Sequence, residues 1–508
     1  MLARARTFAI EALQARAVAV EVDIRPGLPA FTIVGLGDAT VREARDRVHA
    51  AILNSGFQFP AQRITANLAP ADIPKVGPGF DLALACAVLA ASGQIPSESL
   101  ATHALFGELS LDGEVRAAHG TLAVAEASRK ASLEMLLVGP ARAREAMLVA
   151  DLRVGVVQSL VSAARVLAGG EPDPAPPPAP ERPGERALLP DLGDVRGRPD
   201  AVGALTIAAA GAHNCLFTGP PGTGKTMLAQ RLPSILPPLS HEEAIEVLRI
   251  HSVAGRLQSE TLVRERPFRA PHHSITTAGL IGGARQGWVG EVVLAHNGVL
   301  FLDELCEFER APLDALRQPL EDGRVAIVRA RHSTVYPSRF MLVAATNPCP
   351  CGYAGVDDRC RCKPHELARH RRRLSGPLLD RIDLLVRMER AGSESLATPP
   401  TTSSAAAAER VLLARERQAA RLRAVGVLVN AHMTAAMLRA HVDLDPRAEQ
   451  MLARVRERSV LSARGVHRAL RVARTIADLE AHSRVEQSDL AMALSLRPGF
   501  GAEERRAA

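Results

Sequence analysis

Residues 219–226 read Gly219-Pro220-Pro221-Gly222-Thr223-Gly224-Lys225-Thr226 and fit the phosphate-binding loop pattern. The apolar run Asn214–Thr218 predicts a strand before the loop, and Met227–Leu232 predicts the start of a helix after it. Backbone N–H groups at such a junction form a cradle for anions, aided by the helix dipole. We therefore predict that the eight residues bind a nucleoside triphosphate, with Lys225 reaching the β- and γ-phosphates and Thr226 holding Mg²⁺.

A second motif is an apolar strand that ends in two carboxylates, Val299-Leu-Phe-Leu-Asp303-Glu304. This form predicts that Asp303 positions Mg²⁺ and that Glu304 activates the attacking water. Lys225 and Asp303 are 78 positions apart (303 − 225), which is more than a simple strand–helix–strand–helix–strand path needs. The glycine-containing segment 266–288 therefore predicts an insertion with a projecting loop between the two motifs.

A further strand, Phe340–Thr346, ends in the polar side chain of Asn347, which we expect beside the γ-phosphate. Two short runs before it, residues 324–329 and 333–336, predict a β-hairpin. Three cationic side chains fall near the turn of this hairpin. These residues are Arg329, Arg331 and His332. They either belong to a solvated turn or contact the substrate.

Two motifs that contain arginine follow in the C-terminal part of the chain. The first is Leu-Leu-Asp-Arg381-Ile-Asp, and the second is Ser-Ala-Arg464-Gly at the start of a predicted long helix. Together with the preceding motifs, they resemble an AAA+ ATPase with a helix-2 insert and a pre-sensor hairpin. The resemblance implies that Asn347 is sensor 1. It also implies that Arg381 is the arginine finger, which lies at the subunit edge and faces the γ-phosphate of a neighbouring subunit. It also implies that Arg464 is sensor 2, with Arg468 as the alternative.

Within the AAA+ proteins, three segments are similar to the magnesium-chelatase-like family called YifB or ComM: Ala295–Glu304, Asn347–Gly352 and Leu374–Asp383. That family pairs a Lon-protease-like N-terminal domain with the AAA+ module, so the likeness covers nearly the whole chain. It implies ATP and Mg²⁺ as cofactors and self-association into a hexamer. It further implies a DNA branch-migration helicase that acts on branched or single-stranded DNA in natural transformation.

The N-terminal part has a resemblance of its own. Ala71–Phe80 looks like the active-site segment of Lon-type proteases, but Gly79 stands where the nucleophilic serine would be. Phe106–Val115 resembles the strand pair before the catalytic lysine of that family, and Leu122 falls about where this lysine would be. Because a serine nucleophile needs its hydroxyl and a base, we expect no protease activity.

We predict an α/β protein with five segments. Residues 1–168 form the Lon-like α+β domain, and residues 169–190 form a proline-rich linker. Residues 191–390 form the AAA+ αβα core with the helix-2 insert, the pre-sensor-1 hairpin and a cysteine cluster. Residues 391–408 form a flexible connection, and residues 409–500 form a C-terminal helical lid that resembles the magnesium-chelatase C-terminal region.

The chain has seven cysteines, and four of them cluster as Cys349-Pro-Cys351 and Cys360-Arg-Cys362. Two such pairs can supply four thiolates to a tetrahedral Zn²⁺, although the pairs are tighter than the usual Cys-x₂₋₄-Cys spacing. Reduced thiols without a metal are the alternative. The other three cysteines lie in apolar runs and are predicted core residues: Cys86, Cys215 and Cys306. The basic run Arg369–Arg373 is either a solvated face or a nucleic-acid contact.

The 508 residues carry a formal net charge of +7, which makes polyanions possible partners. The longest apolar run, Leu82–Ala91, is too short to span a bilayer, so we expect a cytoplasmic protein without a membrane partner. An ATP-driven DNA motor is the leading hypothesis. The alternatives are the ATPase subunit of a magnesium chelatase and a remodelling or scaffold ATPase that does not act on DNA. Against the chelatase stand the additional N-terminal domain, the cysteine cluster and the basic excess.

Overall fold

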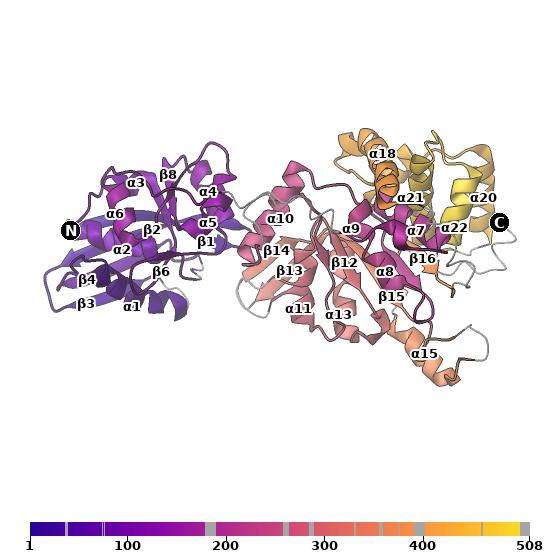
Figure 1. Cartoon of the computed structure of the whole chain (residues 1–508), viewed down its shortest axis with the longest axis horizontal. Coiled ribbons are helices and arrows are strands. Elements are labelled where there is room, and N and C mark those ends of the chain that lie inside the picture. The colour runs from indigo at the N-terminus through magenta and orange to yellow at the C-terminus, as the bar shows by residue number, and fades with distance from the viewer. Residues whose placement is uncertain are drawn as a thin grey trace.

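The computed structural model describes residues 1–35, 39–73, 75, 77–177, 189–257, 264–283, 289–329, 332–354, 359–374, 376–390, 402–458 and 461–497. The molecule is elongated, with the N-terminal domain at one end and the C-terminal helices at the other (Figure 1). Among the helices in these ranges, none combines the length and the apolar character that a membrane crossing requires.

The N-terminal domain is built on a mixed seven-stranded sheet with the order β3-β4-β2-β1-β5-β8-β9. Strands β1, β2 and β4 pair antiparallel, whereas β5, β8 and β9 add in parallel to the other side of β1. The strands are β1 (Leu2–Glu11), β2 (Gln14–Arg25), β3 (Ala30–Val34), β4 (Arg63–Ala69), β5 (His103–Phe106), β8 (Met135–Val138) and β9 (Arg153–Val156), and a separate pair consists of β6 (Glu108–Leu109) and β7 (Val115–Arg116). The helices are α1 (Ala39–Asn54), α2 (Asp81–Ala91), α3 (Ser99–Thr102), α4 (Thr121–Lys130), α5 (Pro140–Met147) and α6 (Leu160–Leu167).

The longest apolar run of the sequence, Leu82–Ala91, forms the central helix α2 of the N-terminal domain. All residues of α2 are buried, and the helix packs against β1 and β2. A helix that is apolar on every side needs neighbours on every side, which explains why this run is enclosed within the domain. Its one carboxylate, Asp81, is paired with Arg47 at 2.8 Å.

The position expected for a serine nucleophile has no room for a side chain. A β-carbon on Gly79 would lie 2.5 Å from Cε2 of Phe106. At the position expected for the catalytic lysine, Leu122 is a buried core residue. Both residues of the expected catalytic pair are therefore replaced, and the space at Gly79 is filled by an aromatic ring.

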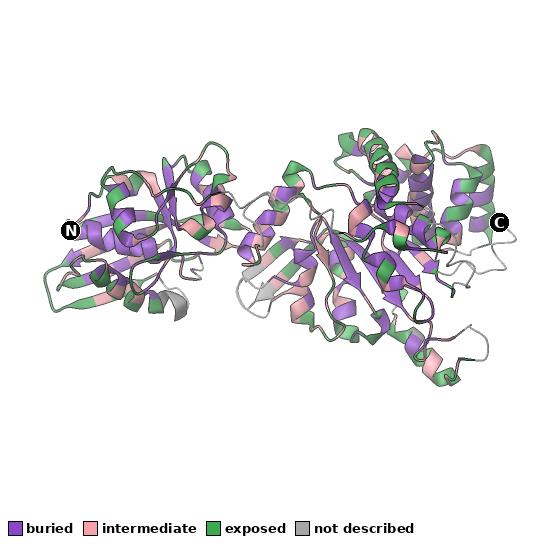
Figure 2. Cartoon of the chain, viewed as in Figure 1, coloured by how far each residue is buried: buried purple, intermediate pink, exposed green. Residues whose placement is uncertain are grey.

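The second unit contains a five-stranded parallel sheet with the order β11-β12-β15-β10-β16. The predicted strands 214–218, 299–302 and 340–346 are confirmed with small changes in their ends. The strands are β10 (Cys215–Thr218), β11 (Phe268–Arg269), β12 (Val299–Leu302), β15 (Met341–Thr346) and β16 (Leu384–Arg387). Figure 2 shows β10, β12 and β15 largely buried within the domain, as expected for the central strands of a parallel sheet covered on both faces, whereas the edge strand β11 is half-buried.

Helices and a hairpin surround this sheet. The predicted hairpin is confirmed as β13 (Arg324–Arg329) paired with β14 (His332–Pro337). The segment between the two nucleotide motifs contains the capped helix α10 (His241–Val253) and the short helices α11 (Thr277–Ile281) and α12 (Glu291–Leu294). The remaining elements are α7 (Pro199–Gly211), α8 (Lys225–Ala229), α9 (Leu232–Ile235), α13 (Arg310–Ala315), α14 (Arg317–Asp322), α15 (Pro364–Arg373) and α16 (Gly376–Leu379).

The C-terminal helices pack on α7 and α9, on one side of the core sheet. They are α18 (Ser404–Leu422), α19 (Ala435–His441), α20 (Pro446–Glu457), α21 (Ala463–Leu479) and α22 (Gln487–Ser495). One hydrophobic cluster contains Phe217 and Phe301 of the sheet together with Val411 of α18 and Ala473 of α21. The helical region begins at Ser404, inside the segment predicted as a flexible connection, because the Ser403 hydroxyl accepts from the N–H of Ala406 and caps α18.

The N-terminal domain contacts the core through α10. The buried Glu145 carboxylate accepts from the Ser252 hydroxyl and, at 2.8 Å, from the N–H of Leu122. Arg249 of α10 forms a 2.6 Å ion pair with Glu126 of α4. The two units are thus joined by a buried polar contact as well as by the linker, whose residues 178–188 lie outside the described ranges.

Because Phe106 fills the space beside Gly79, we predict that the fold tolerates a serine poorly at this position. Because the new side chain would overlap Phe106, we expect Gly79→Ser to lower the free energy of unfolding by about 1–3 kcal/mol, measured by denaturant titration. Both the wild type and the variant should leave unfolded casein intact.

The matched control is Gly203→Ser, because a β-carbon there meets no atom within 4 Å. We expect this exposed substitution to leave stability nearly unchanged. Casein cleavage by Gly79→Ser that is absent from the wild type would show that the protease site is intact apart from its nucleophile.

Candidate nucleotide-binding site

The phosphate-binding loop lies between β10 and α8, as the sequence predicts. Lys225 is buried, and its ammonium donates to the carbonyls of Gly219 at 2.7 Å and Pro220 at 2.9 Å. Burial lowers the pKa of Lys225, and the charge of Asp303 opposes this shift. Glycine is required at position 219, since a β-carbon would lie 2.1 Å from the Met388 carbonyl oxygen.

The two predicted Mg²⁺ ligands meet. The Thr226 hydroxyl donates to a carboxylate oxygen of Asp303 at 2.7 Å. A hydroxyl and a carboxylate are oxygen donors of the kind that Mg²⁺ prefers. The two residues are 77 positions apart in sequence (303 − 226) and converge because β10 and β12 both end at the carboxyl edge of the sheet.

Glu304 has a strained backbone at this edge. Its φ of 50° and ψ of 46° place it in the left-handed region, which side chains other than glycine adopt at a cost. The conformation turns the chain immediately after β12, and the N–H of Glu304 donates to the Asp303 carboxylate at 2.9 Å. His273 lies 3.6 Å from the Glu304 carboxylate. The sequence analysis assigned no role to His273, although the adjacent histidines at positions 272 and 273 were a visible signal.

Asn347 is positioned from both sides at the end of β15. Its side-chain oxygen accepts from Lys225 at 3.1 Å, so it lies at the phosphate-binding loop. Its backbone carbonyl lies 3.0 Å from the ring Nε2 of the buried His370 on α15. The structure therefore brings Asn347, Lys225, Thr226 and Asp303 together as expected.

The predicted arginine finger and sensor 2 do not join this group. Arg381 precedes β16, and its guanidinium pairs with Glu321 of α14. Arg468 on α21 lies 3.4 Å from the carboxylate of Asp383, which also precedes β16. Arg381, Arg464 and Arg468 line one cleft of about 860 Å³ between the sheet and the C-terminal helices.

This cleft lies at the opposite edge of the sheet from the phosphate-binding loop. Asn214, which immediately precedes β10, lines the cleft, whereas the loop follows β10. Asp383 lies beside Asn214 and accepts from its backbone N–H at 3.2 Å. Four strand residues at about 3.3 Å each separate the two edges by roughly 13 Å. Arg381 and Arg464 consequently face away from the nucleotide site of their own subunit.

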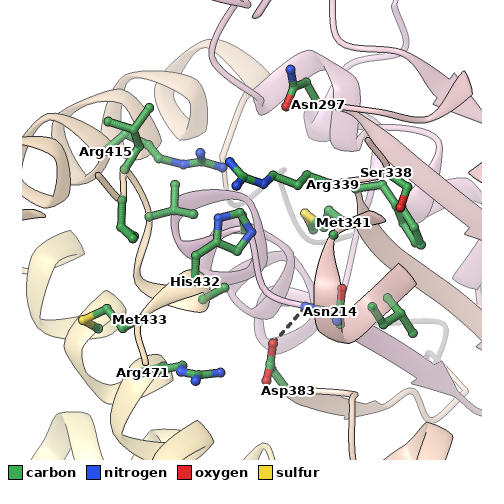
Figure 3. Close-up of a pocket in the computed structure, with 18 of the residues that line it drawn as sticks. Asn214, Asn297, Ser338, Arg339, Met341, Asp383, Arg415, His432, Met433 and Arg471 are labelled. Atoms are coloured by element: carbon green, nitrogen blue, oxygen red, sulfur yellow. Dashed lines mark hydrogen bonds between the residues drawn. The ribbon is translucent and has the colours of Figure 1, made fainter. Parts of the chain in front are cut away.

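The cleft has an excess of positive charge, because eight arginines and five carboxylates line it. Figure 3 shows Arg339 and Arg415 directed toward each other from opposite walls, with His432 and Arg471 below them. Burial and the neighbouring guanidinium groups lower the pKa of His432 to about 4. Burial opposes ionisation of Asp383, but hydrogen bonding from His213 and the charges of Arg468 and Arg497 lower its pKa to about 2. Asp383 is thus an ionised anchor between the sheet edge and α21.

The four clustered cysteines converge as predicted. Their sulfur atoms all lie within 4.8 Å of one another, so they could hold one metal ion. The residues are Cys349, Cys351, Cys360 and Cys362. The three predicted core cysteines are buried: Cys86, Cys215 and Cys306.

Several predicted contacts fall partly outside the described residues. Trp288 and Arg331 lie there, as do the side chains of Arg329 and His332. Of the basic run 369–373, Arg369 and Arg372 are exposed on α15. Arg373 donates to the Cys306 carbonyl at 2.6 Å and so fixes the turn after the Glu304 motif.

Family models match three parts of the chain. Residues 191–396 match magnesium chelatase, subunit ChlI, and residues 401–497 match its C-terminal region. Residues 20–142 match a further model, subunit ChlI of Mg-chelatase.

Full-length relatives are similar throughout. An uncharacterized protein of Mycobacterium tuberculosis is 44% identical over 98% of both chains. Competence protein ComM of Haemophilus influenzae is 42% identical over 96% of this chain and 95% of its own. YifB of Escherichia coli is 42% identical over 94% of both chains. Together with the phosphate-binding loop and its Mg²⁺ ligands, these matches show that the chain belongs to the YifB/ComM family of magnesium-chelatase-like AAA+-type ATPases.

Proposed function

We propose that the protein is an ATP-driven motor that assembles into a closed ring, a hexamer as the family resemblance implies, and moves branched or single-stranded DNA. The observation that carries the proposal is the division of the catalytic groups between two edges of one sheet. Lys225 and Asp303 lie at the carboxyl edge, whereas Arg381 and Arg464 lie at the amino edge. A subunit with this arrangement needs a second copy to complete its site.

In the assembled form, the cleft of one subunit faces the nucleotide of the next. Arg381 would then act as an arginine finger in trans, by stabilising charge on the transferred phosphoryl group. Arg464 would act beside it, since both line the same cleft. Because each site joins unlike surfaces of two copies, the contact is heterologous and closes into a ring when the rotation permits.

Three further roles belong to the proposal. Glu304 activates the attacking water, Asn347 senses the γ-phosphate, and a Zn²⁺ ion occupies the cysteine cluster. DNA as the substrate is supported by the net charge of +7, by the exposed arginines of α15 and by the name of the Haemophilus relative, a competence protein. Segments 269–288 and 329–332 would line the central channel. There the arginines other than Arg269, which pairs with Glu291 at 2.6 Å, would contact phosphates, and Trp288 would stack on an unpaired base.

ATP hydrolysis stimulated by DNA distinguishes this proposal from the two alternatives. A magnesium chelatase subunit and a scaffold ATPase should hydrolyse ATP at a rate that branched and single-stranded DNA leave unchanged. Strand exchange on a four-way junction, with ATP present, would then test branch migration directly. A protein that remains monomeric with ATP and DNA would exclude the motor.

Binding and hydrolysis should separate in two variants. Lys225→Ala removes the cation that contacts the phosphates and should abolish nucleotide binding, measured with a fluorescent ATP analogue. Glu304→Gln keeps those contacts and should bind the analogue normally, yet hydrolyse ATP very slowly. Loss of binding in both variants would remove the role of Glu304 in water activation.

Mixing experiments test the shared site. Arg381→Ala should bind ATP but lose about 10³–10⁵-fold in hydrolysis rate, the range for arginine fingers. Arg464→Ala should bind ATP and lose hydrolysis as well. Each should regain activity when mixed with Lys225→Ala, which is itself inactive, because a Lys225→Ala subunit supplies intact arginines to a neighbour with an intact loop.

The matched control is Arg447→Ala, an exposed arginine of α20 that does not line the cleft. It should hydrolyse ATP like the wild type. If Arg464→Ala is inactive and no mixture restores it, Arg464 acts within its own subunit and the proposed division of the site is wrong.

A further inference from the structure

The geometry of the cysteine cluster fits a tetrahedral metal. Thiolates about 2.3 Å from Zn²⁺ lie about 3.8 Å from one another in a tetrahedron. The sulfur of Cys360 lies 3.9 Å from that of Cys349 and 3.8 Å from that of Cys351. Cys349 and Cys351 are closer, at 3.3 Å. The N–H of Ala354 also donates to the sulfur of Cys349 at 3.2 Å, a bond that stabilises a thiolate ligand.

The loop between these cysteines is part of the wall of the phosphate-binding loop. Gly352 is buried, and a β-carbon there would lie 2.6 Å from Cδ of Pro221. Its φ of +86° is in the region that favours glycine. Two requirements thus coincide at Gly352: a backbone turn that closes the cysteine loop, and close approach to the loop that holds the phosphates.

Two more contacts tie the same segment to the nucleotide site. Asn347, which accepts from Lys225, is only two residues before Cys349. The guanidinium carbon of Arg390 lies 5.3 Å from the centre of the Tyr353 ring. Arg390 is two residues after Met388, whose carbonyl packs against Gly219. The cysteine loop therefore touches both the phosphate-binding loop and the strand end beside it.

We propose that Zn²⁺ at Cys349, Cys351, Cys360 and Cys362 acts as a clamp that holds residues 349–354 against Pro221 and thereby sets the nucleotide-binding geometry of the phosphate-binding loop and Asn347. The inference rests on the proposed zinc ion and ATPase activity and adds a positioning role for the metal. Without the metal, this segment loses the cross-link that orders it. Because folding forms the site, the binding free energy of the metal also contributes to the free energy of folding.

The first experiment uses the full-length protein and two independent measurements. Elemental analysis should give one zinc ion per chain, and a fluorescent ATP analogue reports nucleotide affinity without turnover. Removal of zinc with a strong chelator should weaken the analogue's affinity roughly tenfold or more, because residues 349–354 are then no longer held against Pro221. Addition of Zn²⁺ should restore the affinity.

The second experiment leaves the metal in place. Gly352→Ala forces the cysteine loop away from Pro221, so it should keep its zinc and still bind nucleotide more weakly. Gly93→Ala is the matched control, because Gly93 has a φ of +75° but a β-carbon there meets no atom within 4 Å. This control should keep both zinc and nucleotide affinity, which separates the contact with Pro221 from general backbone strain.

The outcomes distinguish the clamp from the ATPase itself. A wild type without zinc, or a zinc-free protein that binds the analogue as tightly as the loaded one, overturns the clamp and leaves the ATPase proposal standing. Equal affinity of Gly352→Ala and Gly93→Ala also overturns it. A zinc-loaded wild type that does not bind the analogue at all would instead overturn the ATPase proposal.

Discussion

Burial of both faces of a parallel sheet is the constraint on which the nucleotide site depends. Along β10, Cys215 and Phe217 pack into the cluster that reaches the C-terminal helices, while Leu216 packs into the cluster on the other face. The same alternation occurs in β12 and β15. Because side chains fill both faces, only the two edges of the sheet remain for polar groups, and the chemistry of this protein is found at those edges.

The two edges carry different parts of one reaction. All strands run in the same direction, so every loop that follows a strand reaches the carboxyl edge, where Lys225, Thr226, Asp303 and Asn347 meet. Residues that precede a strand, such as Asp383, reach the amino edge, where the C-terminal helices add their arginines. One subunit therefore presents a nucleotide cradle on one side and a cationic cleft on the other.

The supporting residues around the cradle form a continuous set of contacts. Arg373 fixes the turn after Glu304, His370 contacts the carbonyl of Asn347, and Gly352 packs on Pro221. All three belong to the segment between β15 and β16. That segment contains the cysteine cluster, so the same stretch of chain that could hold a metal also contacts the phosphate-binding loop.

In the N-terminal domain, the two positions compared with a protease site, Gly79 and Leu122, take part in packing and in the contact with the core. Phe106 fills the space beside Gly79, and the N–H of Leu122 donates to Glu145, which also binds Ser252 of the core. The domain thus contacts α10, a helix of the segment between the two nucleotide motifs. This contact joins residues 107 positions apart in sequence (252 − 145), and nothing in the local pattern marks it.

By itself, the sequence determined the nucleotide loop, the two carboxylates, Asn347 and the convergence of the cysteines. The residues of each of these motifs are close together in the sequence or directly follow a predicted strand. Local patterns of apolar and polar residues therefore reveal them. The early start of α18 was missed because Ser and Ala are common in both connections and helix starts, and the Ser403 cap becomes visible only when the backbone is placed. Only the tertiary structure decided that Arg381 and Arg464 share a cleft at the far edge of the sheet, and that Gly352 touches Pro221. Both facts depend on how segments that are distant in the sequence pack together. This packing is set by shape and burial across the whole chain, so it leaves no periodic signal in the sequence.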